Sequence, residues 1–192
     1  LWMKGERIST AATWPEVERR TLAKTLVELF LHGAFNWGCL HADPHPGNYR
    51  FLRENGVTKV GLIDFGCVKR VSPGFQKGLR EMFTGARRNA SLDADAWRQF
   101  IVMGFNTSLL EPLRVKLGQV VEILTEPFRS HGAFDTRSWN LGPRLAECLG
   151  LERMTFRLAG PPEMIFFLRA FHGLVRYLDA LEVPVRSEEH TS

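Results

Sequence analysis

The residues of this chain best suited to chemistry lie in two short segments, residues 41–48 and 64–66. The first segment holds Asp43 and Asn48, five positions apart, and the second begins with Asp64. Carboxylate and amide oxygens are the hard ligands that Mg²⁺ prefers in proteins, and Asn48 and Asp64 supply one of each. Phosphoryl transfer requires mainly positioning and charge neutralisation, so two metal ligands and an aspartate, Asp43, that orients an attacking hydroxyl or water would suffice for it.

The same residues match two sequence patterns of kinases. Asp43 and Asn48 have the spacing of the catalytic loop H-R-D-x-x-x-x-N, and residues 64–66 read D-F-G, the metal-binding tripeptide. Each pattern alone is weak, because D-F-G is a common tripeptide and Asp43 with Asn48 could form a turn with side-chain caps. Together, in this order, they favour a kinase-like site.

The remaining residues of the two segments have structural roles or roles left open. We expect four of them to shape the loops: His41, Gly47, Phe65 and Gly66. His45 is a second catalytic candidate, which either contacts phosphate or packs within its loop.

A transition-metal cluster of His41, Asp43 and His45 is an alternative. No further histidine follows at ligand spacing, and Pro44 and Pro46 favour a loop over a helix that would present the ligands.

A predicted β-hairpin explains how the two segments meet. Asn55-Gly56 is a strong two-residue hairpin signal between strand-like runs. The runs are residues 49–52 and 57–63. With this turn the numbers of paired residues sum to 111, which places Asn48 opposite Ile63 and next to Asp64. The two polar side chains would lie about 5–8 Å apart, where they could share one Mg²⁺, with Asp43 on the loop before the first strand.

The rest of the chain shows helical periodicity. Thr13, Pro15 and Glu16 predict a helix start with a side-chain cap, and this helix should end near residues 32–33. The further predicted helices are residues 75–88, 92–103, 112–128 and 162–181. We therefore expect an α+β fold, mostly helical, with one small hairpin that carries the catalytic and metal loops.

Composition excludes several classes of protein. The net charge of +4 is scattered, and the densest basic clusters are pairs of residues, so we expect no nucleic-acid partner. No uncharged apolar run approaches the 18 or so residues of a membrane span. Three cysteines without a C-x-x-C pair favour a reducing, cytoplasmic location.

The two ends of the chain suggest a fragment. The sequence starts at Leu1 rather than methionine, and residues 186–192 resemble translated sequencing adapter, with a disordered polar tail as the alternative. We expect one domain over residues 1–185.

With these residues in hand, the chain resembles the UbiB/AarF family of atypical protein-kinase-like proteins. Residues 41–48 are similar to the family's catalytic-loop signature, and residues 63–66 to its metal loop. Pro161-Pro162-Glu163, which runs into a helix with Arg169, is similar to a late family motif, and residues 2–5 to the hinge between the lobes. The resemblance extends over residues 1–185 and implies a kinase C-lobe without its N-lobe.

The resemblance also implies roles and a cellular setting. Asp43 would be the catalytic aspartate, while Asn48 and Asp64 would bind Mg²⁺ and, through it, ATP. The family is linked to biosynthesis of ubiquinone and related prenyl lipids, often at membranes, and shows ATPase activity more readily than protein phosphorylation. Nucleotide, lipid or quinone intermediates and a membrane surface are the implied partners. The chain alone, lacking the N-lobe, is expected to be inactive.

Two departures from ordinary protein kinases put peptide substrates in doubt. His45 stands where Ser/Thr kinases usually carry a lysine, and no A-P-E follows Gly66 at the normal distance. Small-molecule phosphotransferases of the aminoglycoside or choline type are an alternative with a similar loop, against which Pro44 and the late Pro-Pro-Glu segment argue. A non-catalytic pseudokinase scaffold is a further alternative, disfavoured because Asp43, Asn48 and Asp64 are all present.

Overall fold

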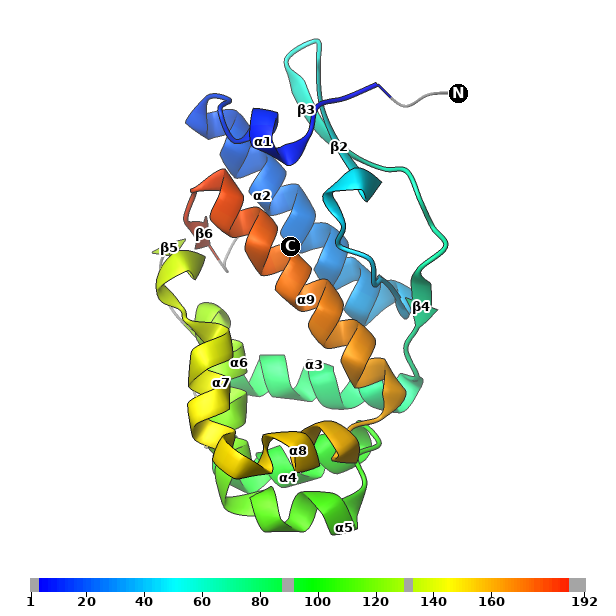
Figure 1. Cartoon of the computed structure of the whole chain (residues 1–192), viewed down its shortest axis with the longest axis vertical. Coiled ribbons are helices and arrows are strands. Elements are labelled where there is room, and N and C mark those ends of the chain that lie inside the picture. The colour runs from blue at the N-terminus through cyan, green and yellow to red at the C-terminus, as the bar shows by residue number, and fades with distance from the viewer. Residues whose placement is uncertain (1–3, 88–91, 130–132, 187–192) are drawn as a thin grey trace. The chain divides into compact units, whose positions relative to one another are not determined.

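The structure is a computed structural model that describes residues 4–87, 92–129 and 133–186. These residues form two compact units. Unit 1 consists of residues 4–70, 133–137 and 166–186, and unit 2 of residues 71–87, 92–129 and 138–165. Figure 1 shows the chain with its helices and strands labelled. The fold is α+β and mostly helical, as predicted.

Unit 1 contains the two segments with candidate chemistry. Its elements in chain order are α1 (Ile8–Ala11), α2 (Glu16–Leu31), the π-helix η1 (His32–Trp37), β1 (Cys39–His41), the 3-10 turn η2 (Pro46–Asn48), β2 (Tyr49–Glu54), β3 (Val57–Leu62), β4 (Val68–Arg70), β5 (Ala133–Phe134), most of α9 (Pro162–Leu181) and β6 (Val185–Arg186).

The predicted hairpin is confirmed in position and register. Strands β2 and β3 pair antiparallel with Tyr49 opposite Leu62, so the numbers of paired residues sum to 111. Asn55 and Gly56 both have positive φ, 53° and 77°, as a type I′ turn requires. The Ile63 amide donates to the Asn48 carbonyl at 3.0 Å, which extends the pairing to the predicted pair.

The expectation of a single pair of strands is wrong. Strand β1 pairs with β4, with His41 opposite Val68, and β5 pairs with β6, with Ala133 opposite Arg186. These strands have two or three residues each, too few for an alternating pattern to show in the sequence. Arg186 therefore lies in a strand, although we assigned it to the tail. Residues 187–192 lie outside the described residues.

The first long helix differs from its prediction at both ends. Thr13 does not cap it, because its hydroxyl donates to the Thr10 carbonyl at 2.8 Å, and α2 begins at Glu16 after Pro15. Beyond Leu31 the helix continues as the π-helix η1 and ends at Gly38, whose φ of 63° is left-handed. The expected stop near residues 32–33 does not occur.

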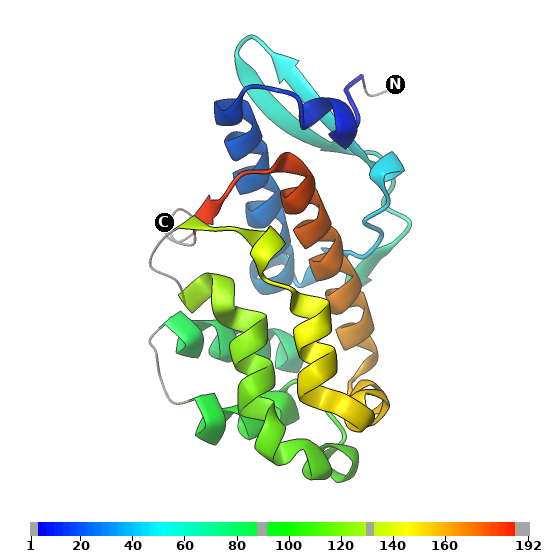
Figure 2. The ribbon, with the colours of Figure 1, turned by 60° about the vertical axis from the view of Figure 1, so that its left-hand side comes forward.

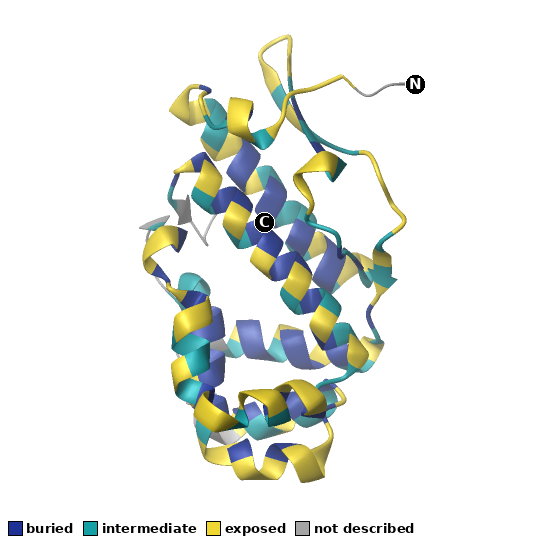
Figure 3. Cartoon of the chain, viewed as in Figure 1, coloured by how far each residue is buried: buried dark blue, intermediate teal, exposed yellow. Residues whose placement is uncertain are grey.

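The core of unit 1 lies between α2 and α9, which run side by side (Figures 1 and 2). The buried faces of these helices are visible in Figure 3. Leu22, Leu26 and Phe30 of α2 are buried, and the Phe30 ring centroid lies 5.5 Å from the centroids of both Phe167 and Phe171 of α9. These aromatic contacts hold α2 and α9 together.

The regular elements of unit 2 among its described residues are all helices. Its elements are α3 (Pro73–Arg87), α4 (Leu92–Val102), α5 (Thr107–Leu110), the 3-10 helix η3 (Glu111–Lys116), α6 (Leu117–Arg129), α7 (Leu141–Leu149), the 3-10 turn η5 (Gly150–Glu152) and α8 (Arg153–Ala159). The predicted helix over residues 112–128 is divided between η3 and α6, and the residues of its predicted apolar face are buried: Leu113, Leu117, Val120, Val121 and Leu124. Helices α7 and α8 were not predicted. Residue 88, the expected end of α3, lies outside the described residues.

Candidate functional site

Two short stretches of paired strands hold the two candidate loops, residues 43–47 and 64–66, close together. On one side β1 pairs with β4, and the Ala42 amide donates to the Cys67 carbonyl at 3.0 Å. On the other side the β2–β3 hairpin extends to the pair of Asn48 and Ile63. The two loops lie between these paired stretches and are therefore fixed at both ends, which is how the sequence brings the two motifs together.

Asp43 and Asn48 are in direct contact. The Asn48 side-chain amide donates to Asp43 Oδ2 at 2.8 Å, and Arg169 Nη2 of α9 donates to Asp43 Oδ1 at 2.9 Å. Both oxygens of the carboxylate thus have a donor. The Asp43 carboxylate is held in one orientation, as a group that orients a nucleophile must be.

The surroundings of Asp43 keep it ionised. Partial burial raises the pKa of the carboxyl group, but the hydrogen bond from Asn48, the charge and hydrogen bond of Arg169 and the His45 backbone amide together hold that pKa below its ordinary value. Arg169 is a residue that sequence reasoning placed only in a late motif, without a role at the site. Its partner lies 126 positions away in sequence, so no local signal could have found the pair.

Asp64 begins the second loop and is exposed. Its Oδ1 accepts a hydrogen bond from the Gly66 amide at 2.8 Å, and its backbone carbonyl is 2.5 Å from His41 Nε2. The exposed Phe65 ring packs edge-on against the His41 ring, with centroids 6.3 Å apart. His41 therefore links the two loops through its ring, and Gly66 shapes the second one.

His45 closes the turn of its own loop. Its Nδ1 accepts from the Gly47 amide at 3.0 Å, which requires the neutral ring with its proton on Nε2. The ring is exposed. His41 and His45 thus each have one nitrogen engaged with backbone, and the described part of the chain holds no group of three His, Cys, Asp or Glu residues able to bind a metal ion. This disfavours the transition-metal alternative.

The oxygen atoms that remain are of the kinds that Mg²⁺ prefers. Because Asn48 uses its amide nitrogen on Asp43, its Oδ1 faces no donor among the described residues. Asp64 follows the residue paired with Asn48 and adds an exposed carboxylate. Mg²⁺ is usually held by one or two protein oxygens together with waters and phosphates, so the two side chains match its needs without a larger cluster.

Helix α9 supports the first loop through residues that the sequence did not single out. A Cβ at Gly173 would lie 2.0 Å from Pro44 Cβ, so the helix and the proline ring touch with no room for a side chain. The Tyr177 hydroxyl donates to the Pro44 carbonyl at 3.2 Å.

Two tyrosines form the buried base of the site. The Tyr49 and Tyr177 ring centroids lie 4.7 Å apart. Burial, with the Asp43 charge as a smaller cause, raises the pKa of Tyr49 to about 12. Burial, followed by the charges of Tyr49 and Asp43, also raises the pKa of Tyr177. Both phenols are therefore neutral over the whole physiological range.

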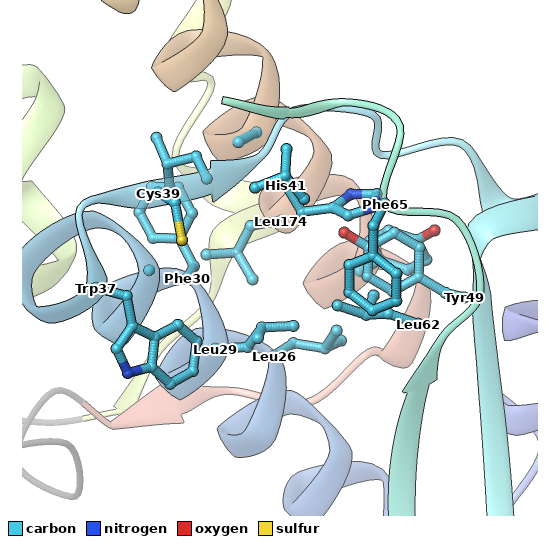
Figure 4. A pocket seen from close by; sticks show the side chains of 15 residues that line it. Leu26, Leu29, Phe30, Trp37, Cys39, His41, Tyr49, Leu62, Phe65 and Leu174 are labelled. Atoms are coloured by element: carbon cyan, nitrogen blue, oxygen red, sulfur yellow. The ribbon is translucent and has the colours of Figure 1, made fainter. Parts of the chain in front are cut away.

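An apolar cavity of about 190 Å³ adjoins the loop of residues 64–66, because Phe65 is part of its lining (Figure 4). It is lined mostly by aliphatic and aromatic side chains, among them Leu26, Leu29, Leu62 and Leu174. Trp37 and Phe65, both more than half exposed, lie at its edges. His41, Tyr49 and Tyr177 are the titratable side chains of its lining besides Cys39, and Asp43, Asn48 and Asp64 do not line it.

None of the helices in the described residues is long and apolar enough to cross a membrane. The domain model that matches this chain is that of the ABC1 atypical kinase-like domain, over residues 1–95. This range is narrower than the 1–185 implied by the sequence resemblance, and it includes both loops and the hairpin.

Named relatives agree with this match. A chloroplastic protein of Arabidopsis thaliana, Activity of BC1 Complex Kinase 8, is 39% identical over 69 residues, 36% of this chain and 9% of the relative. An uncharacterized aarF domain-containing protein kinase, also chloroplastic and from Arabidopsis thaliana, is 27% identical over 88% of this chain and 22% of the relative. The mitochondrial atypical kinase coq-8 of Caenorhabditis elegans is 24% identical over 85% of this chain and 22% of the relative.

The chain thus spans 9 to 22% of the length of these relatives. The matched region contains Asp43, Asn48 and Asp64 in the arrangement described above. Through residues 1–95, the chain belongs to the ABC1 atypical kinase-like family.

Proposed function

We propose that this chain carries the catalytic and metal-binding loops of a Mg²⁺- and ATP-dependent atypical kinase or ATPase. The observation that supports the proposal most directly is the contact of Asn48 with Asp43, which fixes the carboxylate while leaving the amide oxygen of Asn48 for a cation. Kinase catalysis consists largely of such positioning and charge neutralisation.

Each residue then has a distinct task. Asp43 orients the attacking hydroxyl or water and accepts its proton, and its ionised state suits that task. Asn48 and Asp64 would hold Mg²⁺, which would neutralise charge on the phosphates. His45, an exposed residue whose Nδ1 accepts from the Gly47 amide, would donate a hydrogen bond to phosphate through Nε2.

The proposed setting follows from the family. The resemblance implies a role in ubiquinone and prenyl-lipid metabolism, with lipid or quinone intermediates and a membrane surface as partners of the whole protein. The cysteine usage adds the proposal of a cytoplasmic location, with membrane association as the family's contribution. Since the chain spans 9 to 22% of the kinase relatives, we propose that it turns over little ATP by itself.

The test is titration of the protein from the complete reading frame with Mg²⁺–ATP. Asp64→Asn should weaken binding about tenfold or more, since loss of even an outer-shell partner of a metal costs about 10–100-fold. Asp95→Asn, which changes an exposed carboxylate of α4 in unit 2, is the matched control and should bind as the wild type does. Equal binding by the wild type and Asp64→Asn would refute the proposal.

A further inference from the structure

Helix α9 presents three residues to the first loop, each one helical turn from the next. Arg169, Gly173 and Tyr177 are spaced by four, so they lie on one face of the helix. Arg169 contacts the Asp43 carboxylate, Gly173 contacts the Pro44 ring, and Tyr177 bonds to the Pro44 carbonyl. Three different kinds of contact from one helix face therefore converge on two adjacent loop residues.

The contact at Gly173 determines how closely the loop approaches. A Cβ there would lie 2.0 Å from Pro44 Cβ and 2.7 Å from Pro44 Cγ, far inside van der Waals distance. The proline ring cannot rotate away as a flexible side chain would. Glycine in the middle of a 20-residue helix is otherwise unfavourable compared with alanine. Its presence allows the loop backbone to pack directly on the helix.

The contact at Arg169 determines how the carboxylate is oriented. Arg169 Nη2 occupies Asp43 Oδ1 while Asn48 occupies Oδ2, so rotation of the carboxylate would break a hydrogen bond on either side. The guanidinium group is more than half exposed and reaches the loop from α9 rather than from the loop itself. The orientation of Asp43 thus depends on a helix far away in sequence.

We propose that the Arg169–Gly173–Tyr177 face of α9 positions the catalytic loop, with Arg169 as the positioning residue for the Asp43 carboxylate. The catalytic consequence rests on the function proposed above. The positioning itself is a property of the folded chain, and it can be tested without nucleotide.

The first test compares two glycine substitutions in the 192-residue chain. Gly173→Ala should displace Pro44 and shift the ¹⁵N–¹H signals of the Asn48 side-chain amide toward those of solvent-exposed amides. Gly142→Ala, in the first turn of α7 where a Cβ would meet nothing within 4 Å, is the control and should leave those signals unchanged. Unchanged Asn48 signals in folded Gly173→Ala would overturn the proposal.

A compensating variant keeps this test decisive should Gly173→Ala fold poorly. The double variant Gly173→Ala/Pro44→Gly removes the proline ring. The Cα of residue 44 then lies 3.4 Å from the new Cβ, which is an ordinary contact. The double variant should therefore fold better than Gly173→Ala, and the two changes should be strongly non-additive. Additive effects of the two substitutions on stability would show that the close contact between Gly173 and Pro44 does not position the loop.

The second test measures the pKa of Asp43 by carboxyl ¹³C NMR. The groups that face Asp43 are Asn48 and the His45 amide in its own loop, Arg169 and Tyr177 from α9, and Tyr49 from β2. Arg169→Gln should raise the pKa of Asp43 and shift the signals of the Asn48 side-chain amide toward those of solvent-exposed amides. Arg169→Lys should restore the pKa of Asp43 in part, because lysine retains the positive charge. An Asp43 pKa and Asn48 signals unaffected by Arg169→Gln would exclude a positioning role.

The outcomes separate this inference from the proposed function. Displaced Asn48 signals in a chain whose full-length form fails to bind Mg²⁺–ATP would support positioning and refute the kinase proposal. In a full-length protein that does bind, Arg169→Gln should lower kcat severalfold with little change in KM, because it disturbs the orientation of Asp43 and not the metal ligands.

Discussion

The Asp43 carboxylate receives hydrogen bonds from a loop amide, a helix arginine and the His45 backbone, which together keep it ionised. Its pKa in the folded chain lies below the ordinary value of 3.8. At the residue scale this means that the site is preset for a charged aspartate before any ligand arrives.

Acid should therefore destabilise the wild type more than Asp43→Asn. A lowered native pKa contributes stability that is present above the unfolded-state value and is lost as the pH falls through the native value. Urea unfolding between pH 3 and 7 would show a steeper loss below about pH 4 in the wild type. Because the other carboxylates are common to both proteins, the difference reports Asp43, and parallel curves would contradict the expectation.

The two tyrosines predict an alkaline effect of opposite sign. Tyr49 and Tyr177 are the only tyrosines in the chain, and the pKa of each is raised. Their contribution to stability is present below the unfolded-state pKa of about 10 and is lost as the pH rises toward the native value, about 12 for Tyr49. Absorbance at 295 nm should show no ionisation near pH 10 in the folded chain, whereas the chain in guanidinium should titrate there.

The sequence predicts the local part of the site but not its distant part. Asp43, Asn48 and Asp64 were found because their spacing and the Asn55-Gly56 turn are short-range signals. Arg169, Gly173 and Tyr177 lie more than 120 residues from the loop that they contact. Nothing in the local pattern of α9 distinguishes these contacts from ordinary surface and core positions.

At the scale of elements, the sequence predicts the hairpin turn but not the end of the first long helix. The hairpin register followed from two residues, because both central positions of the turn need positive φ. The end of α2 could not be predicted in this way. Gly33 is a typical helix-ending residue, but the helix continues as the π-helix η1 up to Gly38. A Cβ at Gly33 would lie 2.7 Å from the Cys39 carbonyl, so this glycine serves a close approach of backbone rather than a helix end.

The turn gives a clean test of the hairpin. Gly56→Ala should destabilise the chain by about 1–2 kcal/mol, the cost of placing a Cβ at left-handed φ. A Cβ at Gly56 would meet no atom within 4 Å, so conformation alone determines the result. Asn55→Gly is the control and should change stability little, since glycine also adopts positive φ. Urea unfolding measures both, and an unchanged midpoint for Gly56→Ala would argue against the type I′ turn.

At the scale of the whole molecule, the α+β class followed from the sequence because long amphipathic helices dominate it. The two-unit organisation did not, since the parts of each unit are separated along the chain. Helices α7 and α8 also escaped prediction, because each has fewer than ten residues and α8 leaves apolar side chains in solvent. Leu151 of η5 and both Met154 and Leu158 of α8 are at least 60% exposed.

These three side chains should limit solubility. Changing Leu151, Met154 and Leu158 to lysine should reduce self-association, measured by sedimentation velocity, because exposed apolar side chains promote it. Unfolding free energy should change by no more than about 0.5 kcal/mol per substitution. Val17→Lys changes an exposed apolar residue of unit 1, and as a control it should have a smaller effect. Equal association of the triple variant and the wild type would exclude this surface as the cause.

The contact between Arg169 and Asp43 also sets the time at which the site can form during synthesis. The two residues are 126 positions apart. At roughly 5–20 residues per second, α9 leaves the ribosome about 6–25 s after the loop that it supports. Throughout that interval the nascent chain contains Asp43 and Asn48 without the helix that orients the Asp43 carboxylate. The aspartate therefore acquires its arginine partner only after the residues that separate the two have been synthesised.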